Sequence, residues 1–305
     1  MRQVRDAEVE ALVTPAAAQD ALHAAFAGLD RGEAALQERV RTQAQGVKLS
    51  TLGAVIPGLG VAGAKVYTTV GGQFRFVILL FATEDGRPLA CFEAGAITRL
   101  RTAACSVLAA RHLANPGARR LALFGTGVQA QAHAVQLAQA YALEEIRLCS
   151  RQAAPVAAMR ALQQATGVPV RSCSAAAALD GAELVVTATR SATPLFHGDA
   201  PAAGAFIAAV GSSLPHTREL DDRCLARASC IAVEWLPQAQ REAGELVLAA
   251  PGVVRRDQLV ELSALVTGRA PGRGAADELT IYKSVGIGLE DVALAGLAWQ
   301  RLNAG

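Results

Sequence analysis

The fold is decided by one stretch of the sequence, RRLALFGTGVQA at residues 119–130. In this stretch an apolar run leads into a glycine-rich turn, and an alanine-rich, helix-forming segment follows. Gly125 permits the tight turn, Gly127 lets the backbone approach a pyrophosphate, and Ala130 lets the helix pack closely on the strand. The alternative is that the glycines only shape a turn, but a strand before it and a helix after it favour a dinucleotide-binding loop. We assign to cofactor binding the residues Gly125, Thr126, Gly127, Val128 and Gln129.

The end of the next predicted strand, residues 146–150, indicates which dinucleotide binds. A fold that takes NAD usually places an acidic side chain there for the ribose 2′-hydroxyl, whereas this chain reads CSRQ at residues 149–152. Arg151 can bind a 2′-phosphate and Ser150 can add a hydroxyl donor, although an ordinary solvated arginine is the alternative. We therefore expect NADPH as cofactor, with NADH used at lower efficiency. Further cofactor-binding candidates are Thr189 and Gly211.

The segment after residue 119 alternates apolar strands with helical or alanine-rich connections. Such alternation predicts a Rossmann-type, doubly wound parallel sheet. A last amphipathic helix is expected over residues 284–302. The strands are expected at residues 120–124, 146–149, 168–173, 184–188, 205–210 and 230–233.

The segment before residue 115 shows a different organisation. Thr14 is a plausible N-cap for a helix that begins at Pro15, and extended pieces follow around residues 38–49. A Gly/Pro-rich loop is expected over residues 53–63, and a hairpin over 76–82 and 88–93. A helix then runs from about residue 96 until NPG at 115–117 ends it. We expect a mainly antiparallel α+β substrate and dimerisation domain at residues 1–115, joined by a C-terminal helix at 282–305, and an NADP-binding domain at 116–281.

The composition is that of a globular enzyme. The 305 residues are 52% hydrophobic and carry a net charge of +2, which gives no support to nucleic-acid binding. The longest apolar runs are too short to span a bilayer, and the first residues lack the apolar region of a signal peptide, so we expect a cytoplasmic protein without membrane association. The six cysteines lack CxxC spacing and are interpreted as free thiols. No metal is expected, because no metal-binding spacing relates the residues His23, His112, His133 and His197.

The chain resembles the ornithine cyclodeaminase and mu-crystallin family in segments that follow the family order. This resemblance implies a homodimer, an antiparallel substrate and dimerisation domain, a Rossmann-type nucleotide domain, and redox chemistry at the carbon bearing an amino acid's nitrogen. The matching segments are VRT at 40–42, Lys65, AITRLRTAA at 96–104, GTGVQA at 125–130, VGSSLPHTREL at 210–220 and YKSVG at 282–286.

The position of Ser213 separates two activities within that family. In the cyclodeaminases it holds an aspartate thought to take a proton during deamination and ring closure, whereas mu-crystallin and its ketimine-reductase relatives have serine. Oxidising an amine requires a base, and an unactivated serine is a poor one. Reducing a preformed imine does not require a base, because a protonated C=N group already carries the positive charge that attracts hydride. Ser213 is therefore a candidate catalytic residue of a reductase.

Three basic residues match the family's cations around the substrate carboxylate: Arg41, Lys65 and Arg101. An arginine suits a planar two-oxygen group, although a solvated helix residue is the alternative for Arg101. Lys65 could also supply a proton to the imine nitrogen if burial lowers its pKa, so it is a candidate catalytic residue as well.

Two departures from mu-crystallin favour a small substrate. Leu214 stands where mu-crystallin has an arginine, and the loop over residues 66–76 is shorter, which makes hormone binding doubtful. The sequence thus predicts an NADPH-dependent ketimine reductase that converts Δ1-pyrroline-2-carboxylate and Δ1-piperideine-2-carboxylate to proline and pipecolate. The alternatives are an NAD-dependent ornithine cyclodeaminase or amino-acid dehydrogenase, and a non-catalytic small-ligand binding protein of mu-crystallin type.

Overall fold

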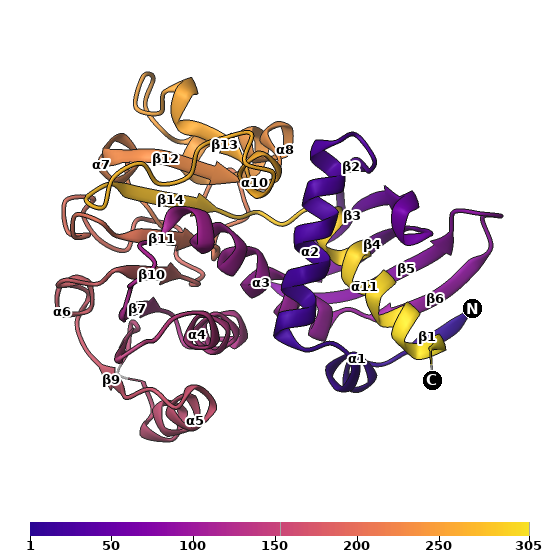
Figure 1. Ribbon diagram of the computed structural model, residues 1–305, viewed down its shortest axis with the longest axis horizontal. Coiled ribbons are helices and arrows are strands. Elements are labelled where there is room, and N and C mark those ends of the chain that lie inside the picture. Colours follow the sequence, from indigo (N-terminus) through magenta and orange to yellow (C-terminus); the bar gives the residue numbers. More distant parts are fainter. Residues whose placement is uncertain (153, 305) are drawn as a thin grey trace. The chain divides into compact units, whose positions relative to one another are not determined.

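The computed structural model describes residues 1–152 and 154–304 and divides them into two compact units (Figure 1). Unit 1 holds residues 1–104 and the C-terminal segment from Gly286, and unit 2 holds Cys105–Val285. The chain changes unit within the helix α3 (Gly95–Leu113) and again after the strand β14 (Leu279–Lys283). The boundary expected at residue 115 thus follows the end of α3, and the one expected at 282 falls inside β14.

Unit 1 is built on a mixed sheet in the order β1-β6-β5-β4-β3-β2. Neighbouring strands are antiparallel except for β1 and β6, which are parallel. The mainly antiparallel sheet and the hairpin expected over 76–82 and 88–93 are confirmed. The strands are β1 (Arg2–Val4), β2 (Ala35–Ala44), β3 (Val47–Ile56), β4 (Val61–Val70), β5 (Gln73–Ala82) and β6 (Pro88–Glu93).

Two long helices cover one face of this sheet. The helix α2 (Pro15–Asp30) follows the short α1 (Asp6–Leu12) and begins as expected, since Thr14 Oγ1 accepts a hydrogen bond from Ala17 N at 3.3 Å. The helix α11 (Gly288–Asn303) packs beside α2 and across β3 and β4 (Figure 1). Nearly all of α11 up to Gly296 is buried, so this helix completes the core of unit 1.

The loop expected over residues 53–63 is shorter than the glycines suggest. The strand β3 continues to Ile56 and β4 begins at Val61, with only the turn η1 (Pro57–Leu59) between them. Gly53 is needed for close packing instead of for a loop. A Cβ atom at Gly53 would lie 2.6 Å from the carbonyl oxygen of Gly63, and one at Gly288 would lie 2.4 Å from that of Gly53. Glycines inside the strands therefore let α11 approach the sheet backbone.

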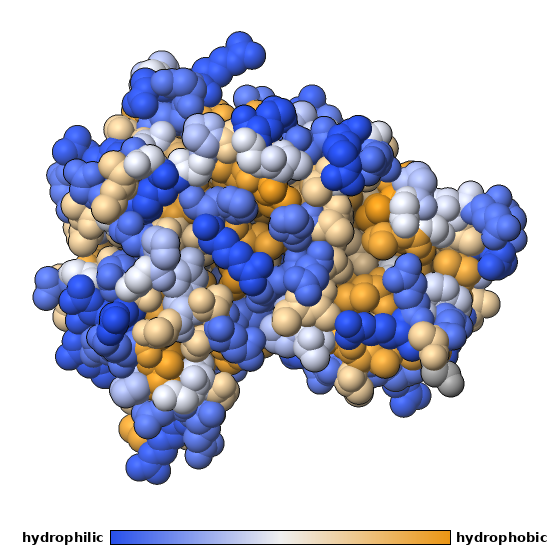
Figure 2. Space-filling model, in the orientation of Figure 1, coloured by the Kyte–Doolittle hydropathy of each residue, from blue (hydrophilic) through white to orange (hydrophobic). Residues whose placement is uncertain are grey.

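The opposite face of the sheet carries outward-pointing apolar side chains. The strand register places Val40, Thr51, Val66 and Val77 opposite one another on it. Val40 is 53% exposed and Val77 is 39% exposed, although both lie in the middle of strands. Figure 2 shows unit 1 from the other side, which α2 and α11 cover. Polar and apolar residues are mixed on that side. We call the apolar surface the open sheet face; it includes Val40, Val47, Leu49, Val55, Val66, Val70 and Val77.

Unit 2 is built on a parallel sheet in the order β13-β12-β14-β11-β10-β7-β8-β9. All six strands that the sequence predicts are present, so the Rossmann-type, doubly wound sheet is confirmed. Buried apolar residues of these strands form its core. The strands are β7 (Arg120–Phe124), β8 (Glu145–Cys149), β9 (Val170–Ser172), β10 (Leu184–Thr187), β11 (Phe206–Ala209), β12 (Ala228–Val233), β13 (Leu259–Glu261) and β14.

The helices of unit 2 connect these strands. The longest after α3 follow β7 and β8, which gives the expected strand–helix–strand pattern around the glycine-rich turn. The helices are α4 (Val128–Ala140), α5 (Val156–Thr166), α6 (Ala175–Leu179), α7 (Asp222–Arg227), α8 (Leu236–Glu242), α9 (Gly244–Val247) and α10 (Leu262–Val266), with the short turn η2 (Arg256–Gln258).

The C-terminal segment contains a strand that the sequence does not reveal. Residues 279–283, LTIYK, form β14, every residue of which is buried. The last helix therefore begins at Gly288 instead of at residue 284. The chain is extended between them, and Ile287 precedes the helix with φ −125° and ψ 159°. The apolar periodicity of residues 284–302 predicts the helix correctly but not its start, because buried strands and buried helices have similar apolar sequences.

None of the helices in the described ranges has the length and apolarity needed to cross a bilayer. The six cysteines are free thiols, as the sequence predicts; Cys105, Cys224 and Cys230 are buried and the others are half-buried.

Candidate active site

The glycine-rich turn of unit 2 has the geometry that a dinucleotide requires. Gly125 has a φ of +112°, and a Cβ atom there would lie 2.6 Å from the carbonyl oxygen of Ala188. Gly127 is the N-cap of α4, and a Cβ atom there would meet open space. Ala130 is completely buried, as close packing of helix on strand requires. The start of α4, where a helix has N–H groups without intrahelical partners, therefore lies open to a phosphate.

A pocket of about 480 Å³ opens beside this turn. This volume suits a bound organic cofactor. It is bordered by the carboxyl ends of β7, β8 and β10, which is where ligands bind in open parallel sheets. The lining residues are Phe124, Gly125, Thr126, Cys149, Ser150, Arg151, Thr189, Arg190, Ser191 and Leu195. Five of the cofactor candidates thus share one pocket, and those outside its lining are Gly127, Val128, Gln129 and Gly211.

Two residues that follow β8, Ser150 and Arg151, lie in the lining of this pocket. Arg151 is exposed and lines the pocket. Residues 149–152, CSRQ, include no aspartate or glutamate. Ser150 is half-buried, and its hydroxyl donates to the carbonyl oxygen of Gln152, which closes a local turn. Arg190, on the neighbouring loop, lines the same pocket and is a second cation there.

A buried carboxylate, Glu219, fixes two of the cofactor candidates against each other. The backbone N–H of Thr189 donates to Glu219 Oε1 at 2.8 Å, and the Thr189 hydroxyl donates to the same oxygen at 2.6 Å. The N–H of Gly211 donates to Glu219 Oε2 at 2.8 Å. A Cβ atom at Gly211 would lie 2.3 Å from the carbonyl oxygen of Thr189, so only glycine fits there. These contacts lock the loops after β10 and β11 together.

Ser213 lies on the loop after β11, in unit 2, and is half-buried. Its neighbour Ser212 is buried and donates a hydrogen bond to the carbonyl oxygen of Thr217 at 2.6 Å. The loop therefore has a defined conformation at the carboxyl end of the strand. Ser213 is held near Gly211 by the chain itself, at the edge of the sheet where β10 and β7 also end.

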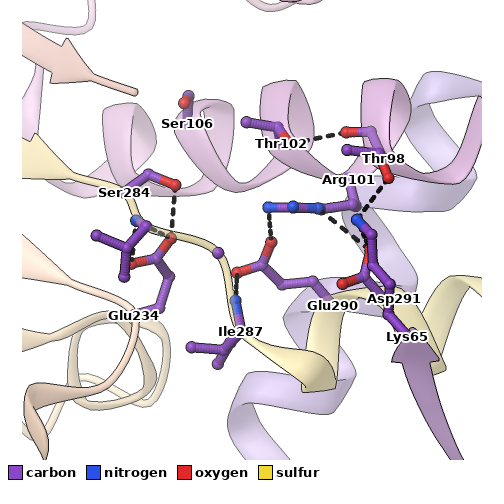
Figure 3. A network of polar contacts seen from close by, with 12 residues as sticks. Lys65, Thr98, Arg101, Thr102, Ser106, Glu234, Ser284, Ile287, Glu290 and Asp291 are labelled. Atoms are coloured by element: carbon purple, nitrogen blue, oxygen red, sulfur yellow. Dashed lines mark hydrogen bonds and ion pairs between the residues drawn. The ribbon is translucent and has the colours of Figure 1, made fainter. Parts of the chain in front are cut away.

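In unit 1, two of the three proposed substrate-binding residues meet at one carboxylate (Figure 3). Lys65, on β4, donates from Nζ to Asp291 Oδ1 at 3.2 Å and to Thr98 Oγ1 at 2.6 Å. Arg101, on α3, lies with Nε 3.4 Å from the same Asp291 oxygen. Its Nη1 donates to Glu290 Oε2 at 2.6 Å. Segments far apart in the sequence thus form one buried cluster of charges.

Burial changes the acid–base behaviour of this cluster. The side chain of Lys65 is only 3% exposed, and its Nζ lies 4.6 Å from the centre of the Phe76 ring. Burial lowers the pKa of Lys65 from 10.5 to about 8, and the positive charges of Arg101 and Arg39 act in the same direction, while the charge of Asp291 opposes them. Lys65 is therefore a cation at neutral pH that can release its proton close to neutrality.

Arg41 lies on the same face of the sheet as Lys65. It is half-buried on β2, and the register pairs it with Ser50, which pairs with Tyr67, two residues from Lys65 on β4. Arg39, which the sequence analysis does not single out, donates from Nη2 to the carbonyl oxygen of Gly286 at 2.8 Å. The sheet thus carries several cations on the face that α11 covers.

Three carboxylates of these sites escape the sequence analysis as functional candidates: Glu219, Glu290 and Asp291. All three are completely buried. Their signal in the sequence is the placing of acids within apolar surroundings, as in GLEDVALAGLA at residues 288–298. A buried acid requires a buried partner, but the sequence does not say which of many distant arginines or lysines supplies it.

Proteins of known sequence that align with this chain include two reductases. A Δ1-pyrroline-2-carboxylate reductase from Bacillus cereus (strain ZK / E33L) is 31% identical over 258 residues, which are 81% of this chain and 79% of that protein. The ketimine reductase mu-crystallin of Mus musculus is 29% identical over 297 residues, 93% of this chain and 91% of that protein. The model of the ornithine cyclodeaminase/mu-crystallin family matches residues 1–305. The chain belongs to this family.

Solved structures agree with this membership. A probable ornithine cyclodeaminase from Bordetella pertussis Tohama I is 57% identical and has a TM-score of 0.98, with 100% of this chain and 97% of that chain covered. The iminosuccinate reductase of Paracoccus denitrificans, solved in complex with NAD+, is 27% identical with a TM-score of 0.92 and the same coverage. The protein is thus an enzyme with the fold of NAD-dependent dehydrogenases, and the resemblance that its sequence motifs indicate is confirmed.

Proposed function

We propose that this enzyme reduces the cyclic imine carboxylates Δ1-pyrroline-2-carboxylate and Δ1-piperideine-2-carboxylate to proline and pipecolate with NADPH. The observation that carries the proposal is the buried pair of cations, Lys65 and Arg101, on a shared carboxylate. With Arg39, which also acts on Lys65, the cations of this site outnumber the two buried carboxylates Glu290 and Asp291 beside them, so the site favours an anionic ligand. The pocket of unit 2, with Arg151 and without a carboxylate after β8, supports NADPH as the cofactor.

Each cation has a distinct part in this reaction. Arg101 binds the substrate carboxylate, oriented by Glu290 and Asp291, and Arg41 adds positive charge on the same sheet face. Lys65 also contacts the carboxylate and gives its proton to the imine nitrogen, after which it regains a proton from water. Its lowered pKa suits this role, because a general acid works best when its pKa is near the operating pH. When NADPH is bound, it supplies the hydride that reduces the carbon of the C=N bond.

Ser213 supports reduction over oxidative deamination. An amine must lose a proton when it is oxidised, and a serine hydroxyl accepts protons far less readily at neutral pH than the carboxylate of an aspartate does. No base is needed when a protonated imine is reduced. We assign Ser213 to a polar contact at the cofactor side of the reaction, in the loop that also holds Gly211.

The test is an assay of both directions with the purified wild-type protein. NADPH consumption is followed with each of the two cyclic imines, and ammonia release is followed with ornithine and NAD at neutral pH. We expect rapid NADPH consumption and no ammonia. A protein that leaves NADPH intact with both imines does not have the proposed activity.

Ornithine cyclodeamination is the second candidate. It is favoured by the 57% identity to a protein called a probable ornithine cyclodeaminase. The lack of a carboxylate at Ser213 argues against it, since that reaction needs a base. Sustained ammonia release from ornithine in the same assay would establish this second candidate and overturn the first.

We also propose that the enzyme is a homodimer that pairs through the open sheet face of unit 1. Several of its apolar side chains are exposed by about half, including Val40 at 53%, Val70 at 51% and Val47 at 45%. A contiguous apolar surface of this kind is typical of an interface, and a two-fold axis would place the face of one copy on that of another.

The dimer is tested by sedimentation of a double variant, Val40→Asp with Val77→Asp. Both side chains point outward from the open sheet face, so the variant should sediment as a folded monomer while wild type sediments as a dimer. Val156→Asp is the control, because Val156 is 59% exposed on α5 of unit 2 and should leave the mass unchanged. A wild-type monomer, or a dimeric double variant, would exclude this interface.

A further inference from the structure

The chain uses arginine for nearly all of its positive charges. Of its 29 lysines and arginines only three are lysines, at positions 48, 65 and 283. Lys48 lies half-buried on β3, whereas Lys65 is buried in unit 1 and Lys283 is buried in unit 2 with Nζ 2.8 Å from Glu245 Oε2. Arginine stays charged in nearly any surroundings, whereas lysine can lose its proton when buried. The protonation state of Lys65 therefore depends on the groups around it.

Asp291 is the group placed to do this. It lies in the first turn of α11, is completely buried, and offers one oxygen to both Lys65 Nζ and Arg101 Nε. Its second oxygen, Oδ2, is buried and accepts no hydrogen bond from the residues that the structure describes. A carboxylate that leaves one oxygen unused in the interior is expensive, so its retention calls for a function.

Glu290 completes the arrangement beside it. Glu290 Oε2 accepts from Arg101 Nη1 at 2.6 Å, and Glu290 Oε1 accepts from the N–H of Ile287 at 3.3 Å. Gly286 has a φ of +74°, and a Cβ atom there would lie 2.7 Å from Arg101 Nη1. Glu290 and the backbone before α11 thus hold the end of Arg101, whereas Asp291 contacts both Arg101 and Lys65.

We propose that Asp291 is a positioning residue for the reduction put forward above: it holds Lys65 and Arg101 as one cation pair and keeps the Lys65 ammonium charged to meet the substrate. This role rests on the proposed function, because the proposed reaction uses the charged form of Lys65. Asp291 acts through Lys65, and no covalent bond to Asp291 forms or breaks in the reaction.

The charges that face Lys65 come from three elements. Asp291 on α11 favours the ammonium form, whereas Arg101 on α3 and Arg39 on β2 disfavour it, as burial does most strongly. Thr98 on α3 and the Phe76 ring on β5 are its uncharged neighbours. Removing the charge of Asp291 takes away the negative charge that raises the pKa of Lys65, while burial and the charges of Arg101 and Arg39 still lower it. The midpoint of Lys65 should then fall by about one pH unit or more, so that at least about half of the lysines are neutral at pH 7.

The first test reads the charge of Lys65 directly. Protein labelled with 13C at the lysine Cε atoms gives three resonances, which Lys48→Arg and Lys65→Arg variants assign. We expect the Lys65 resonance to titrate near pH 8 in wild type and at lower pH in Asp291→Asn. Asp291→Ser, a smaller substitution, serves if the asparagine variant does not fold. An unchanged Lys65 midpoint in a folded variant overturns the proposal. This reading uses neither imine nor nucleotide.

The second test reads the consequence for turnover. With saturating NADPH, the alkaline limb of kcat/KM for the imine should move to lower pH in Asp291→Asn, and activity should be rescued by lowering the pH. Glu290→Gln is the control, since it weakens the hold on Arg101: we expect a higher KM and an unmoved limb. Equal slowing of Asp291→Asn at every pH would show a merely structural role. Wild type that reduces neither imine would instead refute the proposed function, and the resonance test would still decide the role of Asp291.

Discussion

The two candidate binding regions of this enzyme are built in opposite ways. In unit 2 the cofactor candidates lie on loops at the carboxyl ends of β7, β8, β10 and β11 or, for Val128 and Gln129, at the start of α4, and most are exposed or half-buried. In unit 1 Lys65 and Arg101 lie inside a strand and a helix and are almost completely buried. Loop residues contact a ligand through short local motifs, whereas buried charges require partners from elsewhere in the chain. The first region can therefore be recognised from contiguous residues, and the second only when the fold brings its partners together.

This difference predicts how substitutions affect the two regions. A loop residue in unit 2 can be truncated without disturbing the core, so its loss should alter binding of one ligand only. A cation in unit 1 leaves an uncompensated carboxylate behind when it is removed, so its loss should alter both binding and stability.

The largest effect is expected for Arg101→Ala. Truncating one partner of a buried charge pair costs about 4 kcal/mol, so kcat/KM for the imine should fall about a thousandfold. NADPH affinity should stay nearly the same, because the nucleotide pocket is formed by unit 2. Arg99→Ala is the matched control: this arginine lies two residues earlier on α3, pairs with Glu10, and has a side chain 36% exposed. Normal imine turnover by the Arg101 variant would remove it from the substrate site.

A smaller effect is expected for Arg151→Ala. Losing a charge-assisted contact to a 2′-phosphate costs about 2 kcal/mol, so the affinity for NADPH should fall about thirtyfold while that for NADH changes little. Arg190→Ala should be made in parallel, because Arg190 lines the same pocket. If the Arg190 variant loses the preference for NADPH and the Arg151 variant keeps it, our assignment of the two arginines is reversed.

The mildest effect is a dependence on pH. The proposed reaction needs the charged form of Lys65, whose pKa is about 8, so kcat/KM should fall as the pH rises above 8, tenfold per pH unit in the limit. Because the folded-state pKa lies below the ordinary 10.5, the unfolded chain binds more protons between these values, and this group makes folding more favourable as the pH rises through that window. The loss of activity above pH 8 should thus occur without a fall in the free energy of unfolding that is due to Lys65. A profile flat to pH 10 would exclude Lys65 as the acid.

Much of unit 2 can be predicted from the sequence. The glycine-rich turn, the residues after β8 and the alternation of strands and helices are local patterns, and the structure has its strands and helices in the predicted order. The sequence does not indicate β14, because its residues, LTIYK, precede a helix whose apolar pattern runs on from them. The short β13 carries no clear alternation over its three residues.

Less of unit 1 can be predicted. Resemblance pointed to Lys65 and Arg101, but Asp291 and Glu290 lie 226 and 189 residues further along the chain from the groups that they contact. No spacing rule connects such residues. Similarly, the sequence predicts a loop at Gly53, because only the packing of α11 shows that a strand there has no room for a side chain.

The most direct test of the account is to follow the hydride itself. The wild-type protein is incubated with Δ1-pyrroline-2-carboxylate and NADPH that carries deuterium at both hydrogens of nicotinamide C4, and the proline is analysed by mass spectrometry and NMR. We predict proline with one deuterium, bound to the Cα atom that was the carbon of the C=N bond, and one NADPH consumed per proline. Proline without deuterium, or NADPH left unchanged while ornithine yields ammonia, would contradict the account.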